Sequence, residues 1–144
     1  MARYVAHVPL RWTDQDSYRH VNHARTVTLL EEARIGLLFT VASAAGVGTF
    51  GGGLLVAGLE VDYRRQIPYR AEPLRVTMAV RQLRAASFTI DYDLHEGPDE
   101  DSPVAAVGVT RMAMVDLDAQ RPRRLSPDER AFLQRWADSP AVAS

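Results

Sequence analysis

The polar residues between Arg11 and His23 form the densest group of chemically useful side chains in the sequence. Two carboxylates, Asp14 and Asp16, lie on one short stretch that also holds two histidines and Asn22. A carboxylate in this position serves as a nucleophile or as a general base. An Asp before a helix is also a common turn former or cap, so the residues alone leave both interpretations open.

A helix is expected over residues 21–43, directly after this stretch, with Asn22 as its N-cap. Apolar residues recur there at helical spacing, at Leu30, Ala33, Leu37 and Val41. The first backbone N–H groups, those of His23, Ala24 and Arg25, have no partner inside the helix. Such donors and the helix dipole stabilise an oxyanion. A carboxylate beside this helix start suits acyl transfer to water.

Two other interpretations involve neighbouring residues. His20 and His23 supply only two nitrogen ligands in a chain without Cys, so no metal site is expected. Glu31 and Glu32 lie two to three turns inside the helix, and the residue types do not rank Asp16 above them as the base.

Alternation of apolar and polar residues predicts the strands that position this group. A first strand covers residues 3–12 and bulges at Pro9 or lies at a sheet edge. Further strands are expected at 54–66, 74–84, 87–95 and 104–117, with a bulge near Thr110 and Arg111 in the last one. The predicted buried faces are Leu55, Ala57, Leu59, Val61 and Tyr63, then Leu74, Val76, Met78 and Val80, then Phe88, Ile90, Tyr92 and Leu94.

The element order predicts an α+β protein with one domain over residues 1–144, in which an antiparallel five-stranded sheet wraps around a long buried helix. Ser126 as N-cap and Pro127 at the first position predict a short C-terminal helix. The glycine-rich segment 46–53 lacks the ending of a phosphate-binding loop and is interpreted as a connector, with a mobile flap as the alternative.

Composition excludes several classes of protein. The formal charge of −1 provides no basic field for nucleic acid or acidic membranes. The absence of Cys excludes disulfides and a thiol nucleophile. No signal peptide and no apolar run of membrane-spanning length are visible, so a cytoplasmic protein is expected.

The stretch RWTDQDSYRHVNHARTVTLLEEAR, residues 11–34, resembles the signature of the 4-hydroxybenzoyl-CoA thioesterase-like branch of the hotdog superfamily. That signature has a D-x-D, a Gly-His-Val-Asn-Asn-like stretch and a helix with Glu-Glu-Ala-Arg. The strand pattern over residues 59–96 is similar too, including the pair Ser87 and Phe88, so the likeness runs from about residue 3 to 117. The His-Gly-Pro pattern of hotdog dehydratases is missing, which argues against that reaction.

The resemblance implies an acyl-CoA thioesterase that uses no metal and no cofactor, because coenzyme A is part of its substrate. Asp16 matches the catalytic carboxylate, the backbone N–H of His23 matches the oxyanion donor, and Asn22 matches a residue that shapes the turn. Asp14 then has a supporting role. The chain departs from the signature at Arg19, where the family has Gly, and at His23, where a second Asn is usual.

The resemblance also implies partners. Arginines are expected to bind the phosphates of CoA, and Arg64, Arg65, Arg81 and Arg84 are candidates, with Ser87 and Arg19 as further substrate contacts. The family forms homodimers through sheet edges, often assembled into homotetramers, with each active site at the dimer interface. Two other functions fit the same residues: hydrolysis of acyl-carrier-protein thioesters, and a non-catalytic acyl-CoA-binding module suggested by Arg19 and His23.

Overall fold

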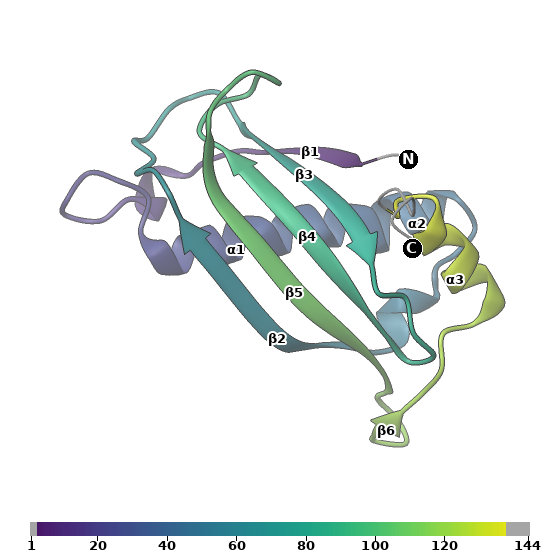
Figure 1. The fold of residues 1–144 in the computed structure, drawn as a ribbon. Coiled ribbons are helices and arrows are strands. Elements are labelled where there is room, and N and C mark those ends of the chain that lie inside the picture. The colour runs from purple at the N-terminus through teal and green to yellow at the C-terminus, as the bar shows by residue number, and fades with distance from the viewer. Residues whose placement is uncertain (1–2, 138–144) are drawn as a thin grey trace.

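Antiparallel strands form one curled sheet that wraps around a long helix (Figure 1). The structure is a computed structural model that describes residues 3–137. The strands lie in the order β1-β3-β4-β5-β2. Their bounds are Tyr4–Val8 (β1), Leu54–Tyr63 (β2), Leu74–Arg81 (β3), Ser87–His95 (β4) and Val104–Asp116 (β5), and a short β6, Arg121–Pro122, pairs with β5. This architecture confirms the predicted α+β hotdog fold.

The long helix begins where the sequence predicts. Helix α1, His23–Ile35, continues through a π-helical turn at Gly36–Val41 into α2, Ala42–Ala44. Oδ1 of Asn22 accepts a hydrogen bond from the Ala24 N–H at 2.9 Å, which confirms Asn22 as the N-cap. Leu30, Ala33 and Leu37 are buried against the sheet. Burial of this face fixes α1 on the sheet and thereby sets where its N-terminus lies.

The two central strands confirm the predicted faces. The inward residues of β3 and β4, predicted from period-two alternation, are all fully buried: Leu74, Val76, Met78 and Val80, and Phe88, Ile90, Tyr92 and Leu94. β1 ends at Val8, before Pro9, and lies at a sheet edge, so the prediction of an edge strand is confirmed while its predicted extent to residue 12 is wrong. A 3₁₀ turn, Trp12–Asp14, follows instead.

The buried face predicted for β2 is buried only in part. Val61 packs against the core, whereas Leu55 and Leu59 are 53% and 47% exposed and Tyr63 is 48% exposed. β2 forms the second edge of the sheet, so it has a neighbour on one side only. Alternation predicts that a strand has one apolar face, but it does not predict what covers that face.

The predicted bulge occurs on the neighbouring strand. β5 pairs regularly with β4 through Thr110 and Arg111, and the extra residue is Ala57 of β2, between Val56 and Gly58. The apolar pattern of β5 is interrupted because Thr110 points inward, where its hydroxyl forms a hydrogen bond of 2.7 Å with the Tyr92 hydroxyl. A satisfied buried polar pair therefore explains the irregular pattern.

The remaining elements lie at the end of the sheet away from the start of α1 (Figure 1). Helix α3, Pro127–Gln134, has the predicted cap Ser126 and Pro127 in its first turn. The segment 46–53 connects α2 to β2 through a 3₁₀ turn, Thr49–Gly52, and so is the predicted connector. Within residues 3–137, no helix has the length and apolarity needed to cross a lipid bilayer.

A buried carboxylate ties these elements together. Glu129 is fully buried. It accepts two hydrogen bonds of 2.9 Å from Arg123, one of 2.8 Å from the Ser126 N–H and one of 2.6 Å from the Thr49 hydroxyl. Burial by itself raises the pKa of Glu129, but these donors outweigh burial and lower the pKa to about 2.

We expect Glu129→Gln to lower the free energy of unfolding by about 3 kcal/mol at pH 7, because it removes the charge that Arg123 pairs with. The folded pKa of about 2 lies below the ordinary value of 4.5, so this stabilisation is complete above about pH 5 and is lost as the pH falls toward 2. Urea denaturation of both proteins from pH 7 to pH 3 measures the difference. A difference in stability that stays constant over this range would contradict the assignment.

Candidate active site

The stretch around Asp16 is a tight hairpin whose ends are bridged by Gln15 and Val21. The Asp16 N–H donates to the His20 carbonyl at 3.1 Å, and the Arg19 N–H donates to the Asp16 carbonyl at 2.9 Å. Arg19 has a φ of 66°, in the left-handed region. A turn followed by one left-handed residue is a common hairpin loop, and Gly is favoured at that residue. Arg19 in place of the family's Gly therefore puts a non-glycine residue in a left-handed conformation, in addition to introducing a charged side chain.

We expect Arg19→Gly to raise the free energy of unfolding by about 0.5 to 1 kcal/mol, because Gly adopts this φ without steric cost. Gln82→Gly gives a comparison at a second left-handed residue, with a φ of 52° in the β3–β4 turn, where the change also removes the hydrogen bond of 3.1 Å from the Thr89 hydroxyl. Thermal and urea denaturation of both variants give the comparison. A loss of stability confined to Arg19→Gly would show instead that the Arg19 side chain makes stabilising contacts.

The Asp16 carboxylate is held at both oxygens. Oδ1 accepts a hydrogen bond from the Tyr18 N–H at 2.9 Å, and Oδ2 accepts one from the Asn22 side-chain amide at 3.1 Å. The Tyr18 N–H, followed by the Asn22 amide, lowers the pKa of Asp16 below its ordinary value of 3.8. Asp16 is therefore an oriented, ionised carboxylate at neutral pH.

Asn22 connects this carboxylate to the start of α1. Its side chain donates to Asp16 and accepts from the Ala24 N–H, while its backbone N–H donates to the Asp14 carbonyl at 2.9 Å. The Arg25 N–H donates to the Asn22 carbonyl at 2.9 Å. Asn22 thus accepts hydrogen bonds from the N–H groups of Ala24 and Arg25. Of the three N–H groups expected to be free, that of His23 alone has no acceptor within residues 3–137. The expectation of three free donors is wrong because the cap residue engages two of them.

Asp14 stabilises the turn that leads into the hairpin. Its side chain is almost fully buried and accepts hydrogen bonds from the Arg11 N–H at 2.8 Å and the Arg11 guanidinium at 3.1 Å. The guanidinium of Arg25 lies 4.0 Å away. A buried carboxylate paired in this way fixes the turn that carries Asp16, and it faces away from the pocket described next.

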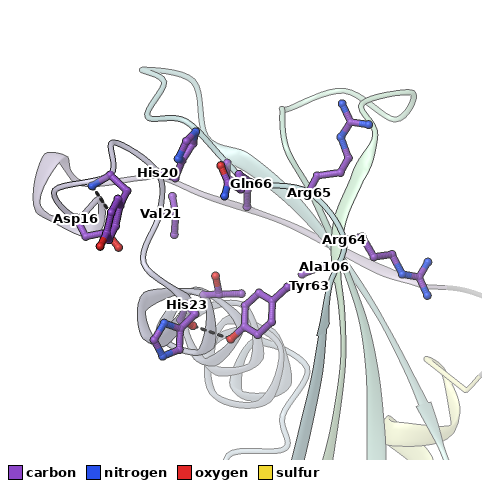
Figure 2. A pocket seen from close by; sticks show the side chains of 12 residues that line it. Asp16, His20, Val21, His23, Tyr63, Arg64, Arg65, Gln66 and Ala106 are labelled. Atoms are coloured by element: carbon purple, nitrogen blue, oxygen red, sulfur yellow. Dashed lines mark hydrogen bonds between the residues drawn. The ribbon is translucent and has the colours of Figure 1, made fainter.

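A pocket of about 440 Å³ opens between this hairpin, the start of α1 and the end of β2 (Figure 2). This volume is in the range of small-molecule sites. It is lined by Asp16, Tyr18, His20, Val21, His23, Thr26, Tyr63, Arg64, Arg65, Gln66, Ile67 and Ala106. The oriented carboxylate and the first residue of α1 therefore line one cavity.

The other predicted residues are distributed around and away from this pocket. Arg64 and Arg65 lie at its rim, and Figure 2 shows their side chains directed away from Asp16 and His23. They pair with Asp62 and Glu96 at 3.0 Å each. Arg19 is exposed and lines a shallow hollow on the other side of the hairpin. Glu31 and Glu32 are exposed and do not line the pocket.

Arg84 and Ser87 lie at the opposite end of the sheet. Ser87 pairs with Ala113 of β5, whereas the pocket residue Ala106 pairs with Leu94 at the far end of β4. Arg84 lies in the turn just before Ser87, where its N–H donates to the Ser87 carbonyl. Within one chain, these two residues therefore do not reach the pocket.

Sequence reasoning missed Tyr63 as a site residue. The sequence places it on the apolar face of β2, but its hydroxyl donates to the His23 carbonyl at 2.8 Å (Figure 2). The residues are 40 positions apart, so no local spacing connects them. Among the described residues, no three His, Asp or Glu side chains gather as metal ligands.

Comparison with known proteins identifies relatives of the whole fold. Residues 10–136 match the model of the thioesterase-like superfamily. No curated protein matches the chain. A putative thioesterase from Pseudomonas aeruginosa is 26% identical, with 88% of this chain and 95% of that chain covered and a TM-score of 0.73.

Two further solved structures share the fold. A predicted thioesterase from Bacillus stearothermophilus is 23% identical, with 96% of this chain and 99% of that chain covered and a TM-score of 0.78. A thioesterase from Thermus thermophilus, complexed with coenzyme A and Zn, is 24% identical, with 94% and 95% covered and a TM-score of 0.75. These structures therefore share the overall fold of the chain.

Proposed function

The chain belongs to the thioesterase-like superfamily, which supports a thioester hydrolase, and from this premise we propose that it hydrolyses an acyl-CoA to the free acid and CoA. The observation that carries the proposal is the shared cavity of Asp16 and the start of α1. The reaction uses no metal and no cofactor.

In this proposal, the thioester carbonyl lies between the Asp16 carboxylate and the His23 N–H. Asp16 removes a proton from a water whose oxygen attacks the carbonyl carbon, or it attacks that carbon directly and water then releases the acid. The His23 N–H and the helix dipole stabilise the oxyanion. The C–S bond breaks as the tetrahedral intermediate collapses. In the general-base route, Asp16 returns the proton of water to the sulfur, which gives the CoA thiol. In the nucleophilic route, CoA leaves as the thiolate and an anhydride joins the acyl group to Asp16; water then hydrolyses this anhydride, and one of its protons passes to the thiolate.

Coenzyme A is the proposed carrier because cationic side chains line the rim of the pocket. The side chains of Arg64 and Arg65 are more than half exposed, and each is paired with an exposed or partly exposed carboxylate. Such surface pairs contribute little stability, so phosphate oxygens can replace the carboxylates at low cost. The Thermus thermophilus thioesterase complexed with coenzyme A supports the same choice.

A homodimer through β2 is part of the proposal. β2 is an edge strand with exposed apolar residues, including Val56 and Leu59. Edge strands of this kind are protected by pairing. Antiparallel pairing of two β2 strands about a two-fold axis places the start of one strand beside the end of the other.

This pairing gives Arg84 and Ser87 a role across the interface. The start of β2 lies at the same end of the sheet as Ser87, because Leu54 pairs with Met114 and Ser87 pairs with Ala113 on β5. In the proposed dimer, the partner's Arg84 and the partner's Ser87 therefore approach the end of the sheet where this copy has its pocket. Their distance from the pocket within one chain is then expected.

Thiol release measured over a panel of aliphatic and aromatic acyl-CoA esters tests the proposal. We expect turnover of at least one class without added metal and in the presence of a chelator. Preference for carrier-bound over CoA-bound acyl groups would identify an acyl-carrier-protein thioesterase instead. Tight binding of CoA esters by calorimetry with no thiol release would identify a non-catalytic binding module.

A further inference from the structure

Tyr63 connects the edge strand to the first residue of α1. It is the last residue of β2 and pairs with Ala106 of β5, so its side chain points to the same inward side of the sheet. Its hydroxyl donates to the His23 carbonyl at 2.8 Å, and its ring meets the His23 ring edge to face, with centroids 6.4 Å apart. Figure 2 shows this contact at the wall of the pocket, below Asp16.

The first turn of a helix is its least constrained part, because its N–H groups lack partners inside the helix. Here the cap of Asn22 engages the Ala24 N–H and leaves that of His23 free. The peptide groups on both sides of the His23 Cα are nevertheless held. On one side, the Asn22 carbonyl accepts hydrogen bonds from the Arg25 N–H at 2.9 Å and the Thr26 N–H at 3.1 Å. On the other side, the Tyr63 hydroxyl donates to the His23 carbonyl.

Resting on the proposed function, we infer that Tyr63 is a positioning residue whose hydroxyl fixes the direction of the His23 N–H toward the oxyanion. The inference assigns Tyr63 a role through His23, and no proton transfer. Desolvation raises the pKa of Tyr63, so its hydroxyl stays protonated and remains a donor at neutral pH. Tyr63→Phe keeps the aromatic ring at the pocket and removes only the hydroxyl, so it tests the hydrogen bond to His23 apart from the bulk of the side chain.

The test compares Tyr63→Phe with Tyr69→Phe. Tyr69 is a matched control because it is also partly exposed and packs its ring edge to face on another aromatic residue, Trp12, outside the pocket. We expect Tyr63→Phe to lower kcat about 10-fold, since a misdirected donor loses transition-state stabilisation. KM and inhibition by free CoA should stay within about two-fold, because the lost contact acts only in the transition state. Tyr69→Phe should leave all of these values unchanged.

A second measurement does not depend on turnover. Backbone ¹⁵N relaxation should show lower order parameters for His23 and Ala24 in Tyr63→Phe than in the wild type, with Ala33 in the middle of α1 unchanged. Unchanged order at His23, or an unchanged kcat in an active wild type, overturns the inference. Lower order at His23 in a wild type that hydrolyses no ester would support the positioning role and refute the proposed function instead.

Discussion

Asp16→Asn is expected to lower kcat for acyl-CoA hydrolysis by about 10²-fold or more, because an amide neither attacks the carbonyl nor accepts the proton of water. The substitution keeps the size of the side chain and an oxygen for the Tyr18 N–H. It places an amide nitrogen or a weaker acceptor opposite the Asn22 amide, so some loosening of the turn is also expected. Initial rates over a range of ester concentrations separate kcat from KM.

Two controls make this result specific. Asp101→Asn makes the same change at an exposed residue of the β4–β5 turn and should retain full activity. Melting temperatures of both variants show whether the turn still folds. Full activity of Asp16→Asn would rule out Asp16 as nucleophile or base and would return attention to Glu31 and Glu32, which are exposed within a single chain.

The pH dependence of the wild type adds a further constraint on Asp16. Since the Tyr18 N–H and the Asn22 amide lower its pKa below the ordinary value of 3.8, the carboxylate is ionised throughout the neutral range. If its ionised form is the active one, the acid limb of kcat/KM in the free enzyme lies below about pH 4. An acid limb well above pH 4 would contradict the assignment of Asp16 as the group that must be ionised.

Closeness along the sequence explains which parts of the site could be predicted. Asp16, Asn22 and His23 lie within eight residues, so a turn and a helix cap bring them together through rules that depend only on neighbours. Tyr63 reaches His23 only through the curvature of the sheet and the seating of α1. No spacing in the sequence predicts that contact. The strand pattern predicts only that Tyr63, like Leu59, belongs to the apolar face of β2.

The same distinction applies to the fold. β3 and β4 have a paired strand on each side and α1 on one face, so their apolar alternation translated directly into burial. β2 shows an equally clear pattern, but the bulge at Ala57 places Leu55 on the outer side of the sheet and Leu59 on the inner side. No strand follows β2 in the sheet, so both residues remain exposed. The sequence predicts the bulge on β5 because Thr110 interrupts an apolar pattern, whereas the extra residue is Ala57 of β2 and the Thr110 hydroxyl forms a hydrogen bond with that of Tyr92. Polarity identifies such positions, but only packing shows whether a polar residue points inward or outward.

The exposed face of β2 leads to the second large effect. Leu59→Glu is expected to convert the proposed homodimer to a monomer and to lower kcat/KM by about 10²-fold or more, because each pocket then lacks the groups of its partner. Leu59 is 47% exposed in the single chain, so a carboxylate there remains hydrated in the monomer. Burying an unpaired carboxylate at the interface costs several kcal/mol, and two-fold symmetry introduces it twice.

Val5→Glu provides the matched control for this substitution. Val5 is 37% exposed and lies on β1, at the opposite edge of the sheet from β2. Light scattering coupled to size-exclusion chromatography gives the mass of each variant, and thiol release gives its activity. A dimeric Leu59→Glu would place the interface elsewhere. A monomeric Leu59→Glu with full activity would mean that Asp16, His23 and Tyr63 of one chain form a complete site, so that the partner's Arg84 and the partner's Ser87 have no part in catalysis.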